Sequence, residues 1–337
     1  MTPMKRKLAE WLQVLWYKDL YVSGWMMPWS MLYVDVIRFR RFLYNIGIFK
    51  RSKLPVPVII VGNITVGGTG KTPLVIHLVQ WLKDNGYNPG VISRGYSGEA
   101  NQTPQTVTAE SDTALVGDEA VLLAKRCACP VAVGVQRVEA AKHLLANHYC
   151  DVIISDDGLQ HYALRRDVEI VVIDGDRRFG NGYCLPSGPL REPQTRIEEV
   201  DFVVVNGGNK ELQAGEFAMQ CQGQTWVNLL TGEQQPASYF QRQVCHALAA
   251  IGNPNRFFAQ IKAAGIEAQT HPFPDHFVFT ADDLQFNDDK PLLMTEKDAV
   301  KCGKFAQANF WYLPVTAQLP AAFSQQLLTL LKQKSHG

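Results

Sequence analysis

The chain has 337 residues, of which 46% are hydrophobic and 19% are charged, and its formal net charge at pH 7 is +1. This composition argues against a disordered or fibrous protein and is typical of a globular one, and the length favours two domains. The seven cysteines show no paired metal-ligand spacing, which argues against a disulfide framework or a zinc site and favours reduced, mostly buried thiols.

Residues 1–53 form a basic, aromatic N-terminal segment that contains four of the seven tryptophans. Its uncharged run, 20–34, has 15 residues and is interrupted by Gly24 and Pro28, whereas a spanning helix needs roughly 20 apolar residues. Aromatic rings with basic flanks suit the lipid headgroup layer. We therefore expect a helical segment that lies on a membrane surface. The alternative is an N-terminal helix whose tryptophans pack on the protein.

A short apolar run, 58–61, leads into a glycine-rich turn and then into a helical pattern that begins near position 73. This order is typical of a P-loop, in which backbone N–H groups and a helix N-terminus bind phosphate. Lys71 would reach the β- and γ-phosphates and the Thr72 hydroxyl would hold Mg²⁺. The alternative is a tight turn without a ligand. The predicted nucleotide-binding residues are Thr65, Val66, Gly67, Gly68, Thr69, Gly70, Lys71 and Thr72.

Buried strands alternate with amphipathic helices between positions 57 and 206. This alternation predicts an α/β fold of the P-loop NTPase type, a mostly parallel sheet with helices on both faces. Ligands bind such sheets beyond the carboxyl ends of the strands. The expected strands are 58–61, 90–93, 131–133, 152–155, 168–173 and 202–205, and the expected helices are 73–85, 118–126 and 137–147.

Acidic pairs stand at two of these expected boundaries. Asp156 and Asp157 follow a buried strand directly, which is where a P-loop enzyme places the carboxylate of its Mg²⁺ shell. Asp118 and Glu119 open a predicted helix, either as a cap and a first-turn acid or as two carboxylates near a triphosphate. For Asp156 and Asp157, a plain turn without a metal remains the alternative. Gln160 lies within one turn of this pair.

The second half of the chain predicts a further domain. Residues 217–243 read as two antiparallel linker strands, and β/α alternation resumes from about 244.

The Gly- and Pro-rich segment 180–193 precedes another strand and is therefore interpreted as an active-site loop. His276 has a catalytic part only if it faces the first domain across a cleft. The predicted division is 1–53 (membrane-associating), 54–216 (P-loop domain), 217–243 (linker) and 244–337 (C-terminal α/β domain).

Taken together, these motifs resemble those of the tetraacyldisaccharide 4′-kinase family, the lipid A 4′-kinases of Gram-negative bacteria. Thr65, which departs from the general P-loop pattern, is itself a feature of the family's version of the loop. The resemblance covers nearly the whole chain. The segments that carry it are 61–73, 93–96, 117–119, 155–161, 180–192, 252–258, 273–277 and 295–298.

The resemblance implies transfer of the ATP γ-phosphoryl to the 4′-hydroxyl of a tetraacyl glucosamine disaccharide 1-phosphate, forming lipid IVA. It also implies a peripheral enzyme on the cytoplasmic face of the inner membrane. ATP and Mg²⁺ are the expected cofactors, and the lipid substrate and the membrane surface are the expected partners. We expect no nucleic acid and no obligate protein partner.

Carried over by position, the resemblance makes Asp118 the general base and His276 its partner from the second domain. Asp156 and Asp157 would join Thr72 in the Mg²⁺ shell, with Glu119 and Gln160 nearby, and Lys71 would offset charge on the moving phosphoryl.

Two other classes fit the sequence less well. A membrane-surface ATPase switch would need its signature lysine at position 66, where this chain has Val66. A GTPase or binding module would need a guanine-reading motif, and the one suggested by residues 295–298 has the wrong spacing by one residue.

Overall fold

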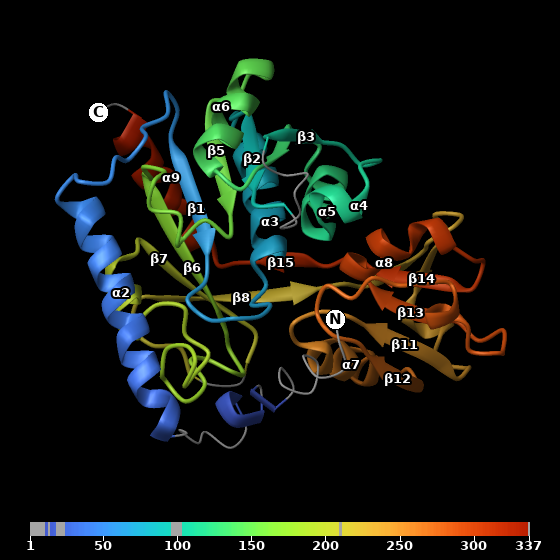
Figure 1. Ribbon diagram of the computed structural model, residues 1–337. Helices are drawn as coiled ribbons and strands as arrows, with labels where there is room; N and C mark the ends of the chain where they lie inside the picture. Colours follow the sequence, from blue (N-terminus) through green and yellow to red (C-terminus); the bar gives the residue numbers. More distant parts are fainter. Residues whose placement is uncertain (1–10, 13, 18–23, 96–102, 209–210, 336–337) are drawn as a thin grey trace.

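The computed structural model describes residues 11–12, 14–17, 24–95, 103–208 and 211–335. Within them, two sheets organise two α/β bodies that lie side by side (Figure 1). The larger sheet has the order β15-β8-β7-β6-β1-β5-β2-β4-β3. Its strands are β1 (Val58–Gly62), β2 (Pro89–Ser93), β3 (Gln105–Val107), β4 (Val131–Val133), β5 (Val152–Asp156), β6 (Val168–Asp174), β7 (Phe202–Asn206), β8 (Glu216–Gln222) and β15 (Thr316–Gln318).

The centre of the larger sheet is parallel and fully buried, because helices cover both of its faces. Strand β1 pairs in parallel with β5 and β6, and every residue of β1 is buried. On one face the core includes residues of α3 (Lys71–Asp84), α5 (Asp118–Cys127) and α9 (Ala321–Ser335). On the other it includes residues of α6 (Arg137–Asn147). The predicted fold class is confirmed.

The smaller sheet has the order β10-β9-β14-β13-β11-β12. Its strands are β9 (Thr225–Asn228), β10 (Gln234–Pro236), β11 (Cys245–Ala249), β12 (Ala268–Pro272), β13 (Leu292–Thr295) and β14 (Phe310–Leu313). Helices α7 (Pro254–Ala263) and α8 (Glu296–Cys302) supply residues to separate cores, one on each of its faces. The short elements are α4 (Thr113–Val116), η1 (Gly24–Met26), η3 (Gln194–Glu199), η4 (Ala237–Tyr239), η5 (Asp282–Leu284) and η6 (Gly303–Phe305).

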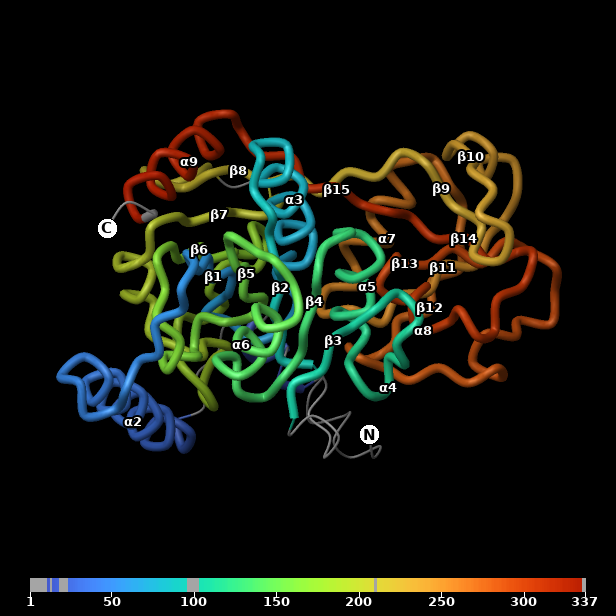
Figure 2. The backbone as a smooth tube through the Cα atoms, turned by 90° about the horizontal axis from the view of Figure 1, so that it is seen from above, coloured from blue at the N-terminus to red at the C-terminus, as the bar shows by residue number. Residues whose placement is uncertain are grey.

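The linker between the two bodies differs from the prediction of two strands within 217–243. Strand β8 is one linker strand, but its antiparallel partner is β15, almost one hundred residues later, and β9 belongs to the smaller sheet. The prediction was wrong because it paired strands that are neighbours in sequence. The chain instead crosses after β8 and returns alongside it through β15, as Figure 2 shows.

The predicted C-terminal domain, 244–337, extends too far. Helix α9 packs on the larger sheet, where the Phe323 ring lies 5.2 Å from that of Phe202 and 5.5 Å from that of Phe217. Phe323 is fully buried. An amphipathic helix can cover either sheet, so its own pattern does not decide which domain it joins.

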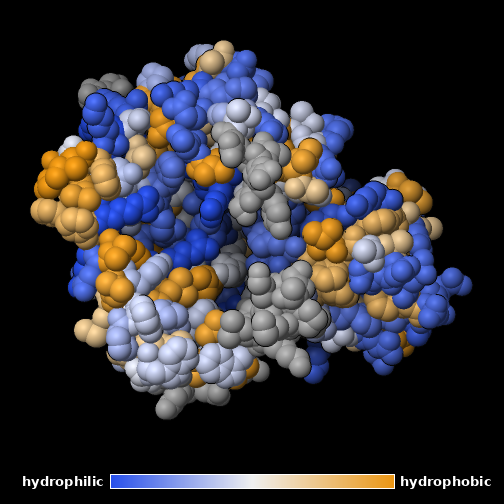
Figure 3. All heavy atoms as spheres, viewed as in Figure 1, coloured by the Kyte–Doolittle hydropathy of each residue, from blue (hydrophilic) through white to orange (hydrophobic). Residues whose placement is uncertain are grey.

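Helix α2 (Met27–Asn45) lies on the outside of the larger body (Figures 1 and 2). Ser30 is its one buried residue among those described, and Trp29 and Phe39 are 60% and 62% exposed. The alternative in which the tryptophans pack on the protein is therefore wrong for Trp29. It holds for Trp16, which is buried and donates its indole N–H to the carbonyl of Pro186 at 3.1 Å. Figure 3 shows hydrophobic residues gathered along this edge of the molecule. None of the helices in the described residues is both long and apolar enough to span a membrane. Lys5, Arg6, Lys7 and Lys18 of the predicted basic segment lie outside those residues.

Candidate active site

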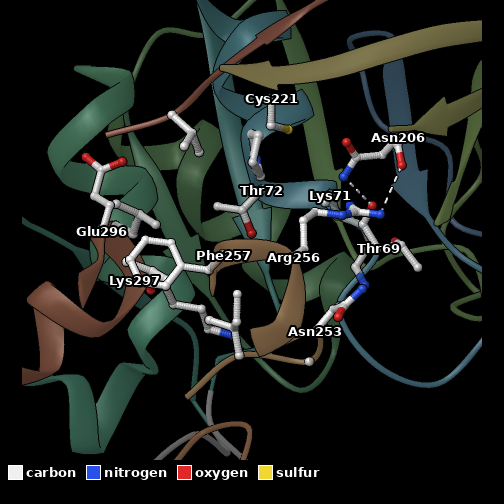
Figure 4. A pocket seen from close by; sticks show the side chains of 18 of the residues that line it. Thr69, Lys71, Thr72, Asn206, Cys221, Asn253, Arg256, Phe257, Glu296 and Lys297 are labelled. Carbon is white, nitrogen blue, oxygen red and sulfur yellow. Dashed lines mark hydrogen bonds between the residues drawn. The ribbon is translucent and has the colours of Figure 1, made fainter. Parts of the chain in front are cut away.

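The glycine-rich turn joins buried strand β1 to helix α3, as a phosphate-binding loop requires. Gly70 has a φ of +96°, and a Cβ there would lie 2.1 Å from Nδ2 of Asn206, so no other residue fits without a shift. That Asn206 amide donates to the carbonyl of Thr69 at 3.0 Å and so secures the turn (Figure 4). Because α3 begins at Lys71, its free N–H groups and dipole form a binding site for an anion.

The P-loop opens into a cleft between the two domains. The cleft encloses about 1100 Å³ of empty space, part of it open to solvent, which is ample for a nucleotide. Lys71 and Thr72 line it from the first domain, and Arg256, Phe257 and Lys297 line it from the second (Figure 4). The cleft thus combines a phosphate-binding turn with apolar walls from both domains.

Asp156 and Asp157 occupy opposite environments at the end of β5. Asp157 pairs with Lys71 at 3.3 Å and with Arg191 at 3.2 Å. Burial alone would raise the pKa of Asp157, but these two cations outweigh it and hold the pKa far below its usual range. Asp156 is fully buried, and neither of its carboxylate oxygens has a hydrogen-bond partner among the described residues. Burial and the nearby Glu119 raise the pKa of Asp156 to about 7.

These residues fit a divalent cation. A buried carboxylate without hydrogen-bond partners, such as that of Asp156, is the kind of oxygen donor that Mg²⁺ prefers. The described residues contain no cluster of three or more acidic, histidine or cysteine ligands, so such a cation would take further ligands from phosphate and water.

Asp118 and His276 come together across the domain boundary, as the family resemblance implies. Gly117 is the N-cap of α5, so Asp118 is its first helical residue. Its Oδ1 lies 3.2 Å from Nδ1 of His276. Burial would raise the pKa of Asp118, but the hydrogen bond with His276 and the charge of Lys297 outweigh it and keep the pKa well below its usual range. The same hydrogen bond raises the pKa of His276.

This pair lines a smaller cavity beside the P-loop cleft, together with Phe277 and Lys301. The next residue of α5, Glu119, faces the P-loop cleft instead. The first turn of α5 therefore separates a cavity that contains an acid–histidine pair from the cleft that contains the phosphate-binding turn.

Glu119 and Gln160 both bind protein groups. The carboxylate of Glu119 accepts from Nζ of Lys297 at 2.9 Å. The amide nitrogen of Gln160 donates to the carbonyl of Asn63 at 3.0 Å and to the buried carboxylate of Glu192 at 2.8 Å. Gln160 thus ties the start of the glycine-rich turn to the 180–193 loop.

The 180–193 loop lies directly against the P-loop. The N–H of Val66 donates to the carbonyl of Pro189 at 2.8 Å, and the N–H of Arg191 donates to the carbonyl of Ile64 at 2.6 Å. Helix α2 holds this loop from outside, where the Tyr33 hydroxyl donates to the Arg191 carbonyl at 3.1 Å. The loop is therefore part of the site and is no linker.

Sequence reasoning missed three cations of this site. Arg191, Lys297 and Arg256 lie in segments that carry the family resemblance, 180–192, 295–298 and 252–258, but none of the three is among the predicted site residues. Arg256 reaches from α7 to Asp174 at 2.9 Å, at the carboxyl end of β6. The available signal was a basic residue next to a Gly- and Pro-rich turn or at a helix N-terminus.

Comparison with known proteins identifies the family. A family model described as tetraacyldisaccharide-1-P 4′-kinase matches residues 22–332. The chain belongs to this family. The resemblance seen in the sequence is thereby confirmed, and the protein is a kinase.

Relatives named tetraacyldisaccharide 4′-kinase match over almost their full lengths. The one from Nitrosococcus oceani is 53% identical over 319 residues, 94% of this chain and 93% of the relative. The one from Methylobacillus flagellatus is 49% identical over 333 residues, 97% and 98% of the two chains. A crystal structure of LpxK from Aquifex aeolicus in complex with ATP superposes with a TM-score of 0.77 at 29% identity, covering 91% of this chain and 98% of that one.

Proposed function

We propose that the protein transfers the γ-phosphoryl of ATP to the 4′-hydroxyl of a tetraacyl glucosamine disaccharide 1-phosphate, forming lipid IVA in lipid A biosynthesis. The observation that carries this proposal is the Asp118–His276 pair, assembled from two domains next to a P-loop cleft. Family membership supports the acceptor, and the ATP bound to the Aquifex aeolicus protein supports the donor.

The P-loop side of the cleft would hold the triphosphate. Backbone N–H groups at the start of α3 and the ammonium of Lys71 would face the phosphates. Asp157 fixes the Lys71 ammonium at 3.3 Å, and Arg191 shares that carboxylate. A cation held in place before the reaction offsets charge on the moving phosphoryl without reorganising, and this is the main source of catalysis in phosphoryl transfer.

The Mg²⁺ of such a kinase would be held by the hydroxyl of Thr72 and the carboxylate of Asp156, with Asp157 and Glu119 beside them. Such an ion would supply positive charge that offsets the negative charge of the phosphate oxygens. Asp156 suits this part because both of its oxygens are free of protein hydrogen bonds among the described residues.

Asp118 would take the proton of the acceptor hydroxyl. An alcohol is a weak nucleophile at neutral pH, so a carboxylate aligned to accept its proton assists attack. The low pKa of Asp118 keeps it ionised, and His276 at 3.2 Å holds its orientation.

We further propose that the protein binds the cytoplasmic face of the inner membrane through α2, as a peripheral enzyme. The helix exposes Trp29, Leu32, Val36 and Phe39 and also carries basic side chains. Such a helix lies in the headgroup layer. Replacing both Trp29 and Phe39 with alanine should lower binding to anionic vesicles severalfold, measured by co-sedimentation. The matched control is Leu230→Ala, at an exposed apolar residue of the other domain. Unchanged binding of the double variant would remove α2 as the anchor.

The activity is tested with radiolabelled ATP and purified tetraacyl disaccharide 1-phosphate, with analysis of where the label is attached. We expect label at the 4′ position, and none with Lys71→Ala. An alternative is a membrane-surface ATPase switch that uses no lipid acceptor. Release of labelled phosphate at the same rate with and without the disaccharide, and no labelled lipid, would favour that alternative.

A further inference from the structure

One lysine lies between acidic side chains of both domains at the active site. Lys297, the second residue of α8, places its Nζ 2.9 Å from Oε1 of Glu119 and 3.3 Å from Oδ1 of Asp275. The same Nζ lies 3.8 Å from Oδ2 of Asp118. Its side chain is only 16% exposed. An ammonium offers three donors, and partly buried, charge-assisted bonds are among the stronger hydrogen bonds in proteins.

The carboxylates that Lys297 binds most closely are the chain neighbours of the acid–histidine pair. Glu119 follows Asp118 in α5, and Asp275 precedes His276 in the second domain. One ammonium therefore joins the two backbone segments that carry Asp118 and His276. It does so from a third segment, α8, which belongs to the same domain as His276 but is about twenty residues away in sequence.

His276 needs such support, because its own surroundings hold it weakly. Its backbone has a φ of +57° and its side chain is 45% exposed. A left-handed histidine in an exposed loop costs conformational energy and gains little from packing. The Oδ1 of Asp275 accepts the N–H of His276 at 3.0 Å, so fixing Asp275 also fixes the turn that presents the imidazole ring.

Helix α8 is itself a rigid base for Lys297. The Thr295 hydroxyl caps it by accepting the N–H of Asp298 at 3.1 Å. Glu296 accepts from Arg126 of α5 through both oxygens, at 2.7 and 2.6 Å. The first turn of α8 is thus docked on α5, and Lys297 projects from it at a defined place.

We propose that Lys297 is a positioning residue for phosphoryl transfer, which acts by joining Glu119 to Asp275 and so holding His276 against Asp118. Removal of its charge leaves three carboxylates facing one another across the domain boundary, and their repulsion moves the His276 loop away from α5. This inference rests on the proposed function, since it concerns the rate of that reaction.

The test is a double-mutant cycle on the full-length protein with the labelled-ATP assay. Lys297→Met should lower kcat roughly tenfold while KM for ATP stays within about twofold, since the change removes positioning and leaves nucleotide binding. In a His276→Ala background, the same substitution should lower kcat by less than about twofold, because residues that act through one another are not additive.

Three further variants make the outcome specific. Lys297→Arg keeps the charge and should recover most of kcat. Asp275→Asn should lower kcat by roughly threefold, again only when His276 is present, and it carries the test if Lys297→Met fails to fold in thermal melting. Lys290→Met is the matched control, because that lysine of the same domain pairs with Asp288 at 2.8 Å, lines neither cavity and should behave like wild type.

Two results would overturn the inference. One is an equal loss in both backgrounds, which would show that Lys297 acts on the nucleotide or the cation. The other is wild-type kcat in both Lys297→Met and Asp275→Asn. Absence of labelled lipid with the wild-type protein would instead refute the proposed function.

Discussion

At the scale of single residues, the surroundings of a side chain decide its chemistry more than its type does. Asp156 and Asp157 are adjacent and chemically identical, yet their pKa values are displaced in opposite directions. Asp157, at a φ of +49°, turns toward Lys71 and Arg191, whereas Asp156 points into a buried site without partners. Groups pushed apart in this way take different parts in a reaction, here an ion pair and a candidate cation ligand.

The prediction for Asp118 concerns proton transfer. Asp118→Asn keeps the size of the side chain but removes the base, so kcat should fall by roughly 10²–10⁴ while affinity for ATP changes little. Rates from the labelled-ATP assay and calorimetric titration with ATP check the two parts. A large loss of ATP affinity would make Asp118 part of the nucleotide or cation site instead.

His161 makes stability depend on pH. Burial, together with the charges of Arg137 and Arg166, lowers its pKa from 6.5 to about 4. The unfolded chain therefore binds a proton below about pH 6.5 that the folded protein does not accept until about pH 4, so stability falls as the pH drops through this window. His161→Gln should make that fall shallower by on the order of 1 kcal/mol, as measured by urea unfolding at pH 7.5 and 5. Equal slopes for both proteins would contradict this.

At the scale of elements, the C-terminal stretch completes the first domain after the chain has built the second. Strand β15 extends the larger sheet beside β8, and α9 then covers the aromatic residues of β7 and β8. The two domains are interdependent, because α9 completes the core of the first domain but follows the whole second domain in the sequence.

Substitution of Phe323 tests how much the packing of α9 contributes to the free energy of unfolding. It is fully buried against Phe202 and Phe217, and a buried Phe→Ala change typically costs about 3–5 kcal/mol. Phe323→Ala should lower the free energy of unfolding by that amount in a urea titration. Tyr149→Ala, at a side chain 80% exposed, should change it by less than about 0.5 kcal/mol. Similar small effects for both would mean that α9 is not part of the folding core.

At the scale of the whole molecule, the two domains meet backbone to backbone at the P-loop. A Cβ on Gly252, in the loop between β11 and α7, would lie 2.1 Å from the amide nitrogen of Gly68. On the same side, Arg177 donates to the Gly252 carbonyl at 2.7 Å, and Arg256 reaches Asp174. The second domain therefore completes the wall of the nucleotide cleft in addition to supplying His276.

Gly252→Ala tests this contact. The added methyl group meets main chain that no side-chain rotation can move, so the domains must separate or the P-loop must shift. We expect ATP affinity and kcat each to fall by roughly tenfold or more, since small displacements at a reacting centre are costly. Gly303→Ala, where a Cβ would meet nothing within 4 Å, is the control. Normal activity of Gly252→Ala would show that the two loops need not touch during turnover.

The sequence by itself determined the strands β1, β2, β4, β5, β6 and β7, the glycine-rich turn and the class of fold. These features depend on hydrogen bonds and side-chain periodicity within a few residues, so the order of amino acids contains them directly. The pattern around residues 58–73 needed no distant partner to indicate a P-loop.

The tertiary structure alone decided that β8 pairs with β15, that α9 covers the first domain, and that Lys297 bridges Glu119 and Asp275. Most of these contacts join residues about one hundred or more positions apart, and the Lys297–Asp275 pair joins two segments of one domain about twenty positions apart. An amphipathic helix or a lysine at a helix start has several equally suitable partners, and only the packing of the whole chain selects among them.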